Sequence, residues 1–322
     1  MSPPPGSILR LGQSGPAPDL ASDNRGSHLL LMSKSYRQIG IIGTGRVASA
    51  IGTALARHCD DPLVVWGRDG GNASAAAAAI GRARTAPAIE EMARICDLLI
   101  LAVSDDALEA CVGALAAAGA PASGFVCHMS GKSGAALLHP LEVQGWRTAA
   151  IHPAMTFTGN PQAEIRQMSG AHFVVTCGSQ EALDEARLIV AMLGGVAVSI
   201  AEAHRPLYHA ALCHGANHLV TLITGACEAL GRAGAEDPAG LLAPLARAAM
   251  ENALSRGIAG LSGPLLRGDA GTIEGHIAAL DADCPSLAPA YRAMGLATLD
   301  ALEAGLGPVD TLACRTILEG EA

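Results

Sequence analysis

Gly43-Thr44-Gly45-Arg46-Val47-Ala48 follows the apolar run Ile39-Gly40-Ile41-Ile42, and this stretch decides the fold. The apolar run predicts a buried strand. The small residues after it allow the backbone to turn tightly, to approach a pyrophosphate and to pack a helix against the strand. Amide groups at the N-terminus of that helix would face the phosphates. A glycine pattern alone is weak evidence, but after an apolar run it predicts a dinucleotide-binding turn at residues 43–48.

A second apolar strand is predicted at residues 63–68, and Gly67 and Arg68 stand at its end. The end of this strand is where a doubly wound sheet recognises the ribose, and a site for NAD carries Asp or Glu there to bind the 2′-hydroxyl. Here Asp69 only follows Arg68. A guanidinium suits a 2′-phosphate, whereas a carboxylate would repel it. We therefore favour NADP(H) over NAD(H); the alternative is that Arg68 is an ordinary surface residue.

Composition excludes several classes of protein. The 322 residues are enough for two domains and a substantial core. A formal net charge of -9 and few aromatic residues argue against nucleic-acid binding, which needs a basic surface and exposed rings. No apolar run is long enough to span a membrane, so we expect a soluble protein. The nine cysteines are scattered and never form CxxC, which favours a reducing cytoplasm over a disulfide framework or a zinc ribbon.

The chain is predicted to have three parts. Residues 1–37 contain Pro, Gly and polar segments without the layout of a secretory signal, and we expect them to be disordered; the biological start is either Met1 or Met32. Residues 38–200 alternate strands with helices, which predicts an α/β fold with a doubly wound parallel sheet. Residues 201–322 are predicted to be all helical.

The expected elements follow the apolar periodicity. In the first domain, further strands are expected at 98–103, 125–131, 148–153, 172–176 and 196–200, and helices at 73–80, 89–95, 107–118 and 180–193. In the second, helices are expected at 205–230, 238–255, 272–280 and 288–304. The helix at 205–230 is apolar nearly all round, so we expect it to be buried.

Polar residues follow several of these strands at the edge where open α/β sheets bind ligands. Val103, Ser104 and Asp105 come at the end of the strand at 98–103, and the loop there commonly lies over the dinucleotide. The alternative for Asp105 is an N-cap of the next helix, and both roles are compatible. Ser130 and His152 end later strands of the same sheet.

Several motifs occur together along the chain. They are Gly43 to Ala48, Gly67-Arg68, His128-Met129-Ser130-Gly131, His152-Pro153 with Phe157, Tyr208-His209-Ala210-Ala211 with Asn217, and Gly263-Pro264-Leu265-Leu266-Arg267-Gly268-Asp269 with His276. Together, from about residue 38 to the C-terminus, they resemble a bacterial family of Rossmann-like proteins whose C-terminal helical domain is catalogued as a domain of unknown function. The nucleotide half also looks like pyrroline-5-carboxylate reductase and deazaflavin-dependent NADP oxidoreductases. The two-domain plan resembles ketopantoate (2-dehydropantoate) reductase, and some members of the family are implicated as an alternative form of that enzyme.

The resemblance implies a Rossmann domain that binds NADP(H), followed by a helical domain similar to the C-terminal domain of 6-phosphogluconate dehydrogenase. It implies an NADP-dependent dehydrogenase or reductase that acts on a small oxo acid or imine. Related folds commonly dimerise through the helical part, so we expect a homodimer. The resemblance leaves open the substrate, the direction of the reaction and whether a deazaflavin is the second redox partner.

Hydride transfer to a carbonyl or an imine requires a proton donor beside the nicotinamide. Ketopantoate reductase has a lysine and an asparagine on the long helix after its nucleotide domain, and the helix here offers His209 and Asn217. We predict His209 as general acid, Asn217 as the group that orients the substrate and His152 as the second candidate for the acid. Ser130 is predicted to bind a substrate carboxylate. The alternatives are structural: a hydrogen bond at the domain hinge for His209, backbone capping for His152 and satisfaction of local amides for Ser130.

Three residues of the helical domain are predicted to bind substrate: Arg267 and Asp269, in a bend rich in Gly and Pro, and His276 in the helix that follows. Arginine binds carboxylates through two hydrogen bonds, but an ion pair between Arg267 and Asp269 is an equally good interpretation.

His214 and His218 have the i, i+4 spacing of a metal pair. No third ligand accompanies them, so we predict no metal. Two alternatives to the reductase stay open: a non-catalytic NADP-binding sensor, and a metal-dependent alcohol dehydrogenase that uses these two histidines.

Overall fold

The computed structural model describes residues 36–119, 124–306 and 311–320. They divide into two compact units between Ala211 and Leu212. We call these the sheet unit and the helical unit, and each is described by itself. The division falls later than the boundary predicted after residue 200, because the chain that follows the last strand still packs on the sheet unit through Arg205, which is 1% exposed.

Most of the predicted N-terminal extension, residues 1–35, lies outside the described residues. The prediction that it reaches residue 37 is wrong for its last two positions. Tyr36 is buried, and its hydroxyl donates a hydrogen bond of 2.9 Å to Glu185 Oε1, while the Arg37 N–H donates to Asp97 Oδ2 at 3.0 Å. An aromatic side chain that is covered in this way fixes the backbone around it, which a polar composition does not reveal.

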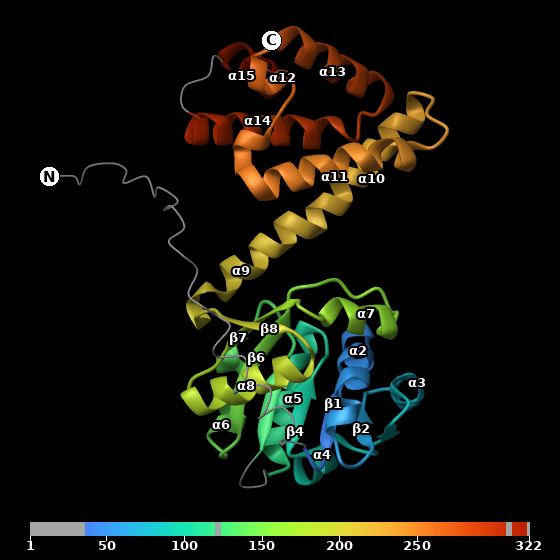
Figure 1. Cartoon of the computed structure of the whole chain (residues 1–322), viewed down its shortest axis with the longest axis vertical. Coiled ribbons are helices and arrows are strands. Elements are labelled where there is room, and N and C mark those ends of the chain that lie inside the picture. The colour runs from blue at the N-terminus through green and yellow to red at the C-terminus, as the bar shows by residue number, and fades with distance from the viewer. Residues whose placement is uncertain (1–35, 120–123, 307–310, 321–322) are drawn as a thin grey trace, which may run out of the picture. The chain divides into compact units, whose positions relative to one another are not determined.

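The sheet unit contains one eight-stranded sheet in the order β3-β2-β1-β4-β5-β6-β7-β8 (Figure 1). The predicted doubly wound α/β fold is confirmed, with one difference. β7 runs antiparallel to β6, so β7 and β8 are reversed relative to the other strands. The strands are β1 (Ile39–Ile42), β2 (Leu63–Trp66), β3 (Ala83–Thr85), β4 (Leu98–Leu101), β5 (Phe125–His128), β6 (Arg147–Pro153), β7 (His172–Thr176) and β8 (Val196–Ser199).

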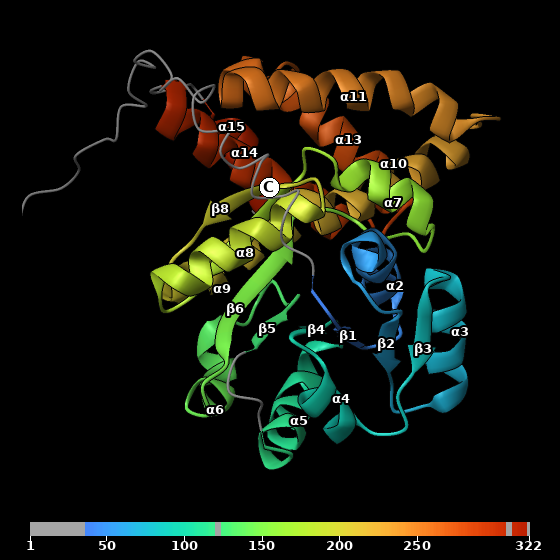
Figure 2. The ribbon, with the colours of Figure 1, turned by 60° about the horizontal axis from the view of Figure 1, so that its bottom comes forward.

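Helices cover both faces of this sheet, as Figure 2 shows for α2 and α8 on one side and α4 and α5 on the other. Alternate strand residues supply the two faces: Ile39 and Ile41 pack in one apolar cluster and Ile42 in the other. The first face carries α2 (Arg46–Leu55), α3 (Gly70–Ile80), α7 (Pro161–Met168) and α8 (Gln180–Met192). The second carries α4 (Ile89–Ile95), α5 (Asp105–Ala117), the 3-10 turn η2 (Ala135–Leu138) and α6 (His139–Glu142).

The strand order reverses at β1, which has β2 on one side and β4 on the other. Open α/β sheets bind dinucleotides outside the carboxyl ends of the strands at such a switch point. The register places the ends of the parallel strands side by side, since Ile42 pairs with Leu101, Leu101 with His128 and His128 with Ala150. The loops after β1, β4, β5 and β6 therefore lie along one edge of the sheet.

A short connection leads from the sheet into helix. After β8 come a 3-10 turn, η3 (Glu202–His204), and then α9 (Arg205–Leu212), the π-helical η4 (Cys213–Asn217) and α10 (His218–Arg232). The single long helix expected at residues 205–230 is thus interrupted by a π-helical turn. Such turns are rare and frequently occur at functional sites.

The helical unit continues with α11 (Pro238–Arg256), η5 (Gly257–Gly260), α12 (Pro264–Arg267), α13 (Ala270–Asp283), α14 (Ala288–Leu306) and α15 (Leu312–Glu319). Its own apolar core lies between α13, α14 and α15, where Ile273, Leu299 and Leu318 are nearly inaccessible. The turn helix α12 and the terminal α15, like β3 and α7 in the sheet unit, were not predicted because they are short. Among the described helices, none is both long and apolar enough to cross a membrane.

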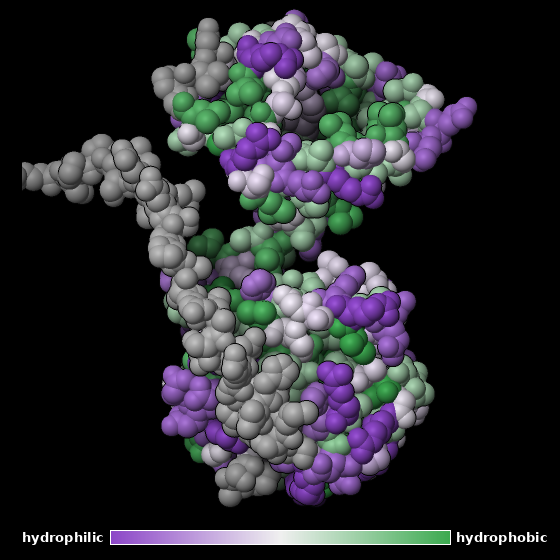
Figure 3. Space-filling model, in the orientation of Figure 1, coloured by the Kyte–Doolittle hydropathy of each residue, from purple (hydrophilic) through white to green (hydrophobic). Residues whose placement is uncertain are grey.

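The expectation that the long apolar helix is buried is wrong. No residue of α10 or α11 is buried, and Val220, Leu245 and Leu254 are 67%, 69% and 82% exposed. Figure 3 shows apolar side chains on the visible surface of this unit. An apolar helix indicates that its side chains are stabilised by contact with another apolar surface. The sequence does not tell whether that surface belongs to the same chain or to a second molecule.

Candidate functional site

The glycine turn borders a cavity of about 190 Å³ in the sheet unit. The ends of β1, β2 and β4 supply its walls. It is lined by Gly43, Thr44, Gly45, Trp66, Gly67, Arg68, Ala102, Val103, Ser104, Ala107 and Cys111. Most of the residues predicted to bind the cofactor are in this set.

Gly43 explains why the turn needs a residue without a side chain. Its φ of +130° is unfavourable for other residues, and a Cβ there would lie 2.2 Å from the carbonyl oxygen of Ala102. The Gly43 N–H donates to the Trp66 carbonyl at 2.9 Å, which ties the turn to the end of β2. The backbone therefore closes on both neighbouring strands at the place where a pyrophosphate would lie.

The helix after the turn begins with unpaired amide groups. Gly45 is the N-cap of α2 and makes no side-chain cap, and the first turn carries no acidic residue. Such an N-terminus attracts an anion. Arg46, Val47 and Ala48 form the first turn of α2 and are not among the residues that line the cavity. Arg46 reaches away to the Phe157 carbonyl at 3.3 Å, and Ala48 is buried in the core.

Arg68 lines this cavity and is exposed, as a residue that meets a ribose phosphate should be. The side chain of Asp69 is the N-cap of α3 and accepts a hydrogen bond from the Asn72 N–H at 2.7 Å. The structure corrects the alternative role of Asp105: Ser104 is the N-cap of α5, and Asp105 is the first helical residue. Asp105 follows the cavity-lining Ser104 in sequence but is not itself part of the lining.

A second group of polar side chains lies at the same edge of the sheet, and we call it the His152 cluster: Ser130, Gly131, His152, Tyr208 and His209. His152 Nδ1 and Tyr208 Oη are 2.7 Å apart. The rings of His152 and His209 meet edge to face with centroids 6.2 Å apart. Gly131 lies against both histidines, since a Cβ there would be 2.9 Å from His152 Nε2 and 2.6 Å from His209 Cδ2. The structure thus brings together three of the predicted catalytic residues.

His128 holds the loop of this cluster in shape. Its Nδ1 accepts from the Ser130 N–H at 3.2 Å, and its Nε2 lies 2.9 Å from the Gly134 carbonyl, which can only accept. These contacts assign the proton to Nε2 and leave the ring neutral. Burial lowers the pKa of His128 to about 4, which agrees with this state. Ser130 Oγ accepts from the Ser133 N–H at 3.0 Å, so the predicted alternative for Ser130, satisfaction of a local amide, is present.

The electrostatics of the cluster favour neutral imidazole. Burial, followed by the positive charge of Arg205, lowers the pKa of His152 to about 4. Burial raises the pKa of Tyr208, and the nearby charge of Arg205 acts in the opposite direction. At neutral pH the pair is therefore a neutral imidazole hydrogen-bonded to a protonated phenol. If the phenol gave up its proton, the resulting phenolate could accept a hydrogen bond from His152 Nδ1.

The sequence analysis assigned no role to Tyr208, a member of the cluster, or to Arg205, which contacts the cluster at Ser130. Tyr208 stands directly before His209, but no spacing rule links it to His152, which lies 56 residues earlier. Arg205 is buried and donates from Nη1 to Thr176 Oγ1 at 3.1 Å and from Nη2 to the Ser130 carbonyl at 2.5 Å. The available signal in the sequence was an arginine at the start of an apolar helix. Arginine is almost never fully buried unless it is paired, so its burial there indicates a specific role.

Of the residues predicted in the helical unit, Asn217, Arg267 and Asp269 lie at helix ends, and His276 lies within α13. Asn217 ends η4 and is exposed. Asp269 is the N-cap of α13 and binds the N–H of Thr272 at 3.1 Å and its hydroxyl at 2.7 Å, and no ion pair joins it to Arg267. The structure thus replaces the predicted ion pair by a helix cap. His276 Nδ1 lies 2.8 Å from Tyr291 Oη, which makes a second histidine–tyrosine pair.

His214 and His218 contact each other, with 3.3 Å between their Nδ1 atoms. Within residues 36–119, 124–306 and 311–320, no group of three potential ligands gathers around a possible metal position. The pair therefore has the spacing predicted for it without further ligands from the described chain.

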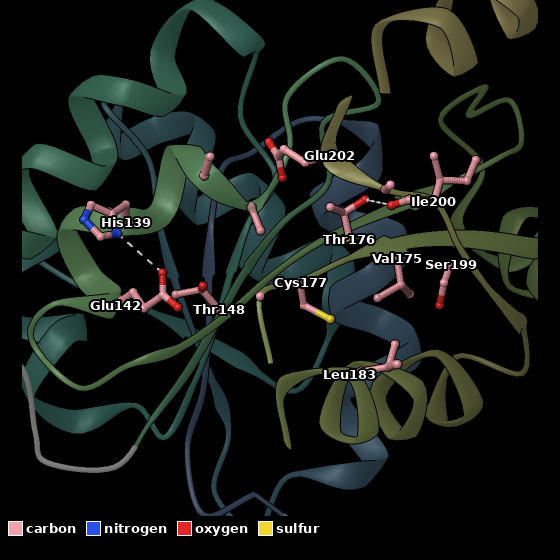
Figure 4. Close-up of a pocket in the computed structure, with 14 residues that line it drawn as sticks. His139, Glu142, Thr148, Val175, Thr176, Cys177, Leu183, Ser199, Ile200 and Glu202 are labelled. Atoms are coloured by element: carbon pink, nitrogen blue, oxygen red, sulfur yellow. Dashed lines mark hydrogen bonds and ion pairs between the residues drawn. The ribbon is translucent and has the colours of Figure 1, made fainter. Parts of the chain in front are cut away.

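A larger cavity, of about 750 Å³, opens where β7 and β8 end (Figure 4). Thr148, Thr176, Cys177 and Ser199 are among its lining residues, and none of the predicted site residues is. It exists because β7 and β8 are reversed, so that their carboxyl ends lie beside the first half of β6. Its wall includes the ion pair between His139 and Glu142, at 3.5 Å.

Comparison with known proteins agrees with this architecture. The profile of a Rossmann-like domain matches residues 23–153, and that of DUF2520, a domain of unknown function, matches residues 171–298. No curated protein matches the sequence.

Several solved structures have the same fold. A candidate NADP oxidoreductase from Bacteroides fragilis superposes with a TM-score of 0.68 at 18% identity over 83% of this chain and 99% of its own. An imine reductase from Myxococcus stipitatus in complex with NADP+ gives 0.62 at 17% identity, over 87% and 99%. A reductive aminase from Aspergillus terreus in complex with NADPH and ethyl levulinate gives 0.62 at 19% identity, over 89% and 99%. At these identities the likeness establishes the fold.

Proposed function

We propose that this chain, which belongs to the proteins that join a Rossmann-like domain to a DUF2520 domain, is an NADP(H)-dependent oxidoreductase. It would transfer a hydride between the nicotinamide and a small oxo acid or imine. One observation carries the proposal: the glycine-lined cavity and the His152 cluster lie at the same edge of one sheet. The cofactors named for the M. stipitatus and A. terreus proteins support it.

The residues that line the 190 Å³ cavity fit a bound dinucleotide in one orientation along the edge of the sheet. Arg68, after β2, would bind the 2′-phosphate, and Gly43 to Gly45 with the N-terminus of α2 would hold the pyrophosphate. The nicotinamide half would then extend toward β4 and β5. Neighbouring strands lie about 4.8 Å apart, so β6 with His152 is only about 10 Å from β4. When bound, NADPH supplies the hydride; the chain must supply the proton.

Tyr208 is suited to donate that proton. When a hydride adds to a carbonyl carbon, the electron pair of the C=O bond moves to oxygen, which takes a proton. In the tautomer with hydrogen on Nδ1, His152 donates to Tyr208 Oη and leaves the phenol proton free to face the substrate. His152 can then pass its Nδ1 proton to the phenolate while its Nε2 takes up a proton from solvent, so that the imidazole stays neutral. His209, our first prediction for the general acid, is the alternative donor in the same cluster.

The other predicted roles stay as proposals: substrate orientation by Asn217, and substrate binding by Ser130, Arg267, Asp269 and His276. We also propose a homodimer. Its support is the exposed apolar surface of α10 and α11, which a second copy of the chain would cover.

Cofactor titration tests the proposal. We expect calorimetry to show that NADPH binds more tightly than NADH. Arg68→Glu should remove this preference, by about 10- to 100-fold in NADPH affinity, because a hydrogen bond to a charged group contributes about 1.5–3 kcal/mol. Arg94→Glu, which changes an exposed arginine at the end of α4, is the matched control and should bind NADPH normally. Wild-type preference for NADH would refute the assignment.

A turnover screen separates the enzyme from the sensor. NADPH oxidation should be followed with ketopantoate, other branched 2-oxo acids and pyrroline carboxylates. Tight binding of NADPH without oxidation by any of them would favour the non-catalytic sensor.

A further inference from the structure

Arg205 is a buried cation without a buried counter-ion. Its side chain is 1% exposed, and both of its hydrogen-bond acceptors, Thr176 Oγ1 and the Ser130 carbonyl, are neutral. In the part of the chain that the structure describes, no carboxylate lies within ion-pair distance of it, and its Nε has no acceptor. Burial of an unpaired charge costs free energy. Groups buried in this way are found mainly at functional sites, where their charge acts on neighbouring groups.

Arg205 lies close to the His152 cluster, so its charge acts on the side chains of that cluster. It begins α9, and Tyr208 follows one helical turn later. Its acceptor Ser130 directly precedes Gly131, which lies against His152 and His209. The charge is therefore one helical turn away from the proposed proton donor, and the carbonyl that it contacts is one residue before the glycine that lies against both imidazoles.

The negative groups nearby are weaker in effect. Glu202, in η3, and Asp105, at the start of α5, are both exposed and thus screened by solvent. For the pKa of His152, the downward effect of Arg205 exceeds the upward effect of Asp105. The same order holds for His128. With His128 and His152 neutral, the buried charge of Arg205 makes the field at this edge of the sheet positive.

Resting on the proposed function, we infer that Arg205 is a positioning residue that selects the substrate by charge. It favours neutral carbonyl compounds, whose oxygen becomes negative during reduction, over iminium ions, which arrive as cations. In the carbonyl reaction, the hydride forms a C–H bond, the C=O electron pair moves to oxygen, and the Tyr208 proton completes the alcohol while NADPH becomes NADP+. A positive field lowers the energy of the oxyanion. It also raises the energy of a bound iminium ion and of its transition state, which still carries part of the positive charge, and therefore lowers kcat/KM for the cation.

The experiment compares two substrates of similar size: the ethyl ester of a 2-oxo acid, which is a neutral carbonyl compound, and N-methylpyrrolinium, a permanent cation. Wild-type protein should reduce the ester with a kcat/KM at least tenfold higher than that of the cation. Arg205→Gln should lower the value for the ester by about tenfold or more and reduce the ratio, since a nearby unit charge is typically equivalent to one to three pKa units. Arg205→Lys, which keeps the charge, should restore the ratio.

A second measurement does not depend on turnover. The imidazole signals of His152, assigned with His152→Gln, are titrated by NMR in wild type, Arg205→Gln and Arg205→Lys. The pKa of His152 should rise in the glutamine variant and stay low in the lysine variant. The inference is overturned if the wild-type protein reduces the cation faster than the ester, and this result does not require Arg205→Gln to fold. It is also overturned if the pKa of His152 is the same in all three proteins. If the pKa moves as expected but no substrate oxidises NADPH, the proposed function fails while the electrostatic role of Arg205 stands.

Discussion

At the scale of single residues, the chemistry of this protein depends on contacts between side chains that are distant in sequence. His152 ends a strand, and Tyr208 lies in the helix after the sheet, yet Nδ1 and Oη are 2.7 Å apart. Burial keeps the imidazole neutral, because it lowers the pKa of His152 to about 4. We therefore propose that the hydroxyl group of Tyr208 donates the proton to the substrate.

Removal of this hydroxyl should lower kcat and leave the binding of NADPH unchanged. We expect Tyr208→Phe to reduce kcat by about 10²- to 10⁴-fold, the usual contribution of a positioned general acid. Tyr291→Phe is the matched comparison, because Tyr291 forms the corresponding pair with His276, with ring centroids 5.9 Å apart against 5.7 Å for Tyr208 and His152. Equal losses in the two variants would mean that the helical-unit pair belongs to the site as well.

At the scale of elements, the loop after β5 decides how closely the histidines meet. His128 and Ser130 fix its backbone by hydrogen bonds, and Gly131 gives it no side chain at the point of contact. The loop therefore acts as a rigid spacer between β6, which carries His152, and α9, which carries His209.

Gly131→Ala tests this spacing. The added methyl group would lie within 3 Å of both imidazole rings, so one of them must move. Overpacking of this kind costs about 1–3 kcal/mol, and we expect a lower free energy of unfolding in urea together with a lower kcat. Gly113→Ala, in the interior of α5 where a Cβ meets nothing within 4 Å, should instead be neutral or stabilising. A Gly131→Ala protein with wild-type stability and kcat would show that the contact is not tight.

At the scale of the whole molecule, the uncovered helices α10 and α11 and the buried histidines of the sheet unit have the widest consequences. α11 presents Leu241 and Leu245 one turn apart and Met250 and Leu254 one turn apart, all of them exposed. At about 3.6 residues per turn, the two pairs lie on opposite faces of α11, so the helix exposes apolar side chains on two sides that a second molecule can cover.

A charge on each of these two faces should separate the subunits, whichever face a second copy covers. We expect wild type to be a dimer by light scattering and Leu245→Lys with Leu254→Lys to shift it toward monomer. Val143→Lys replaces a side chain that is 73% exposed in the sheet unit and serves as the control. A wild-type monomer at micromolar concentration would contradict the proposed homodimer.

Stability should fall in mild acid. The native pKa values of His128 and His152, about 4, lie below the value of about 6.5 for an unfolded histidine. Between these values the unfolded chain binds protons that the native protein does not, so the free energy of unfolding decreases as the pH falls from 6.5 toward 4. His152→Gln should reduce this slope by up to about 1.4 kcal/mol per pH unit, measured by urea unfolding at pH 7, 6 and 5. An unchanged slope would mean that His152 is not buried as described.

The sequence by itself determined the architecture and the cofactor half of the site. Strand periodicity and the glycine turn are local properties, and they gave the doubly wound sheet and placed Gly43, Arg68 and Ser104 at one cavity. Only the tertiary structure decided the reversal of β7, the pairing of Tyr208 with His152 and the burial of Arg205. The physical reason is range: backbone preferences act over a few residues, whereas these contacts join segments that meet only after the strands have paired, and no periodicity in the chain records which segments meet.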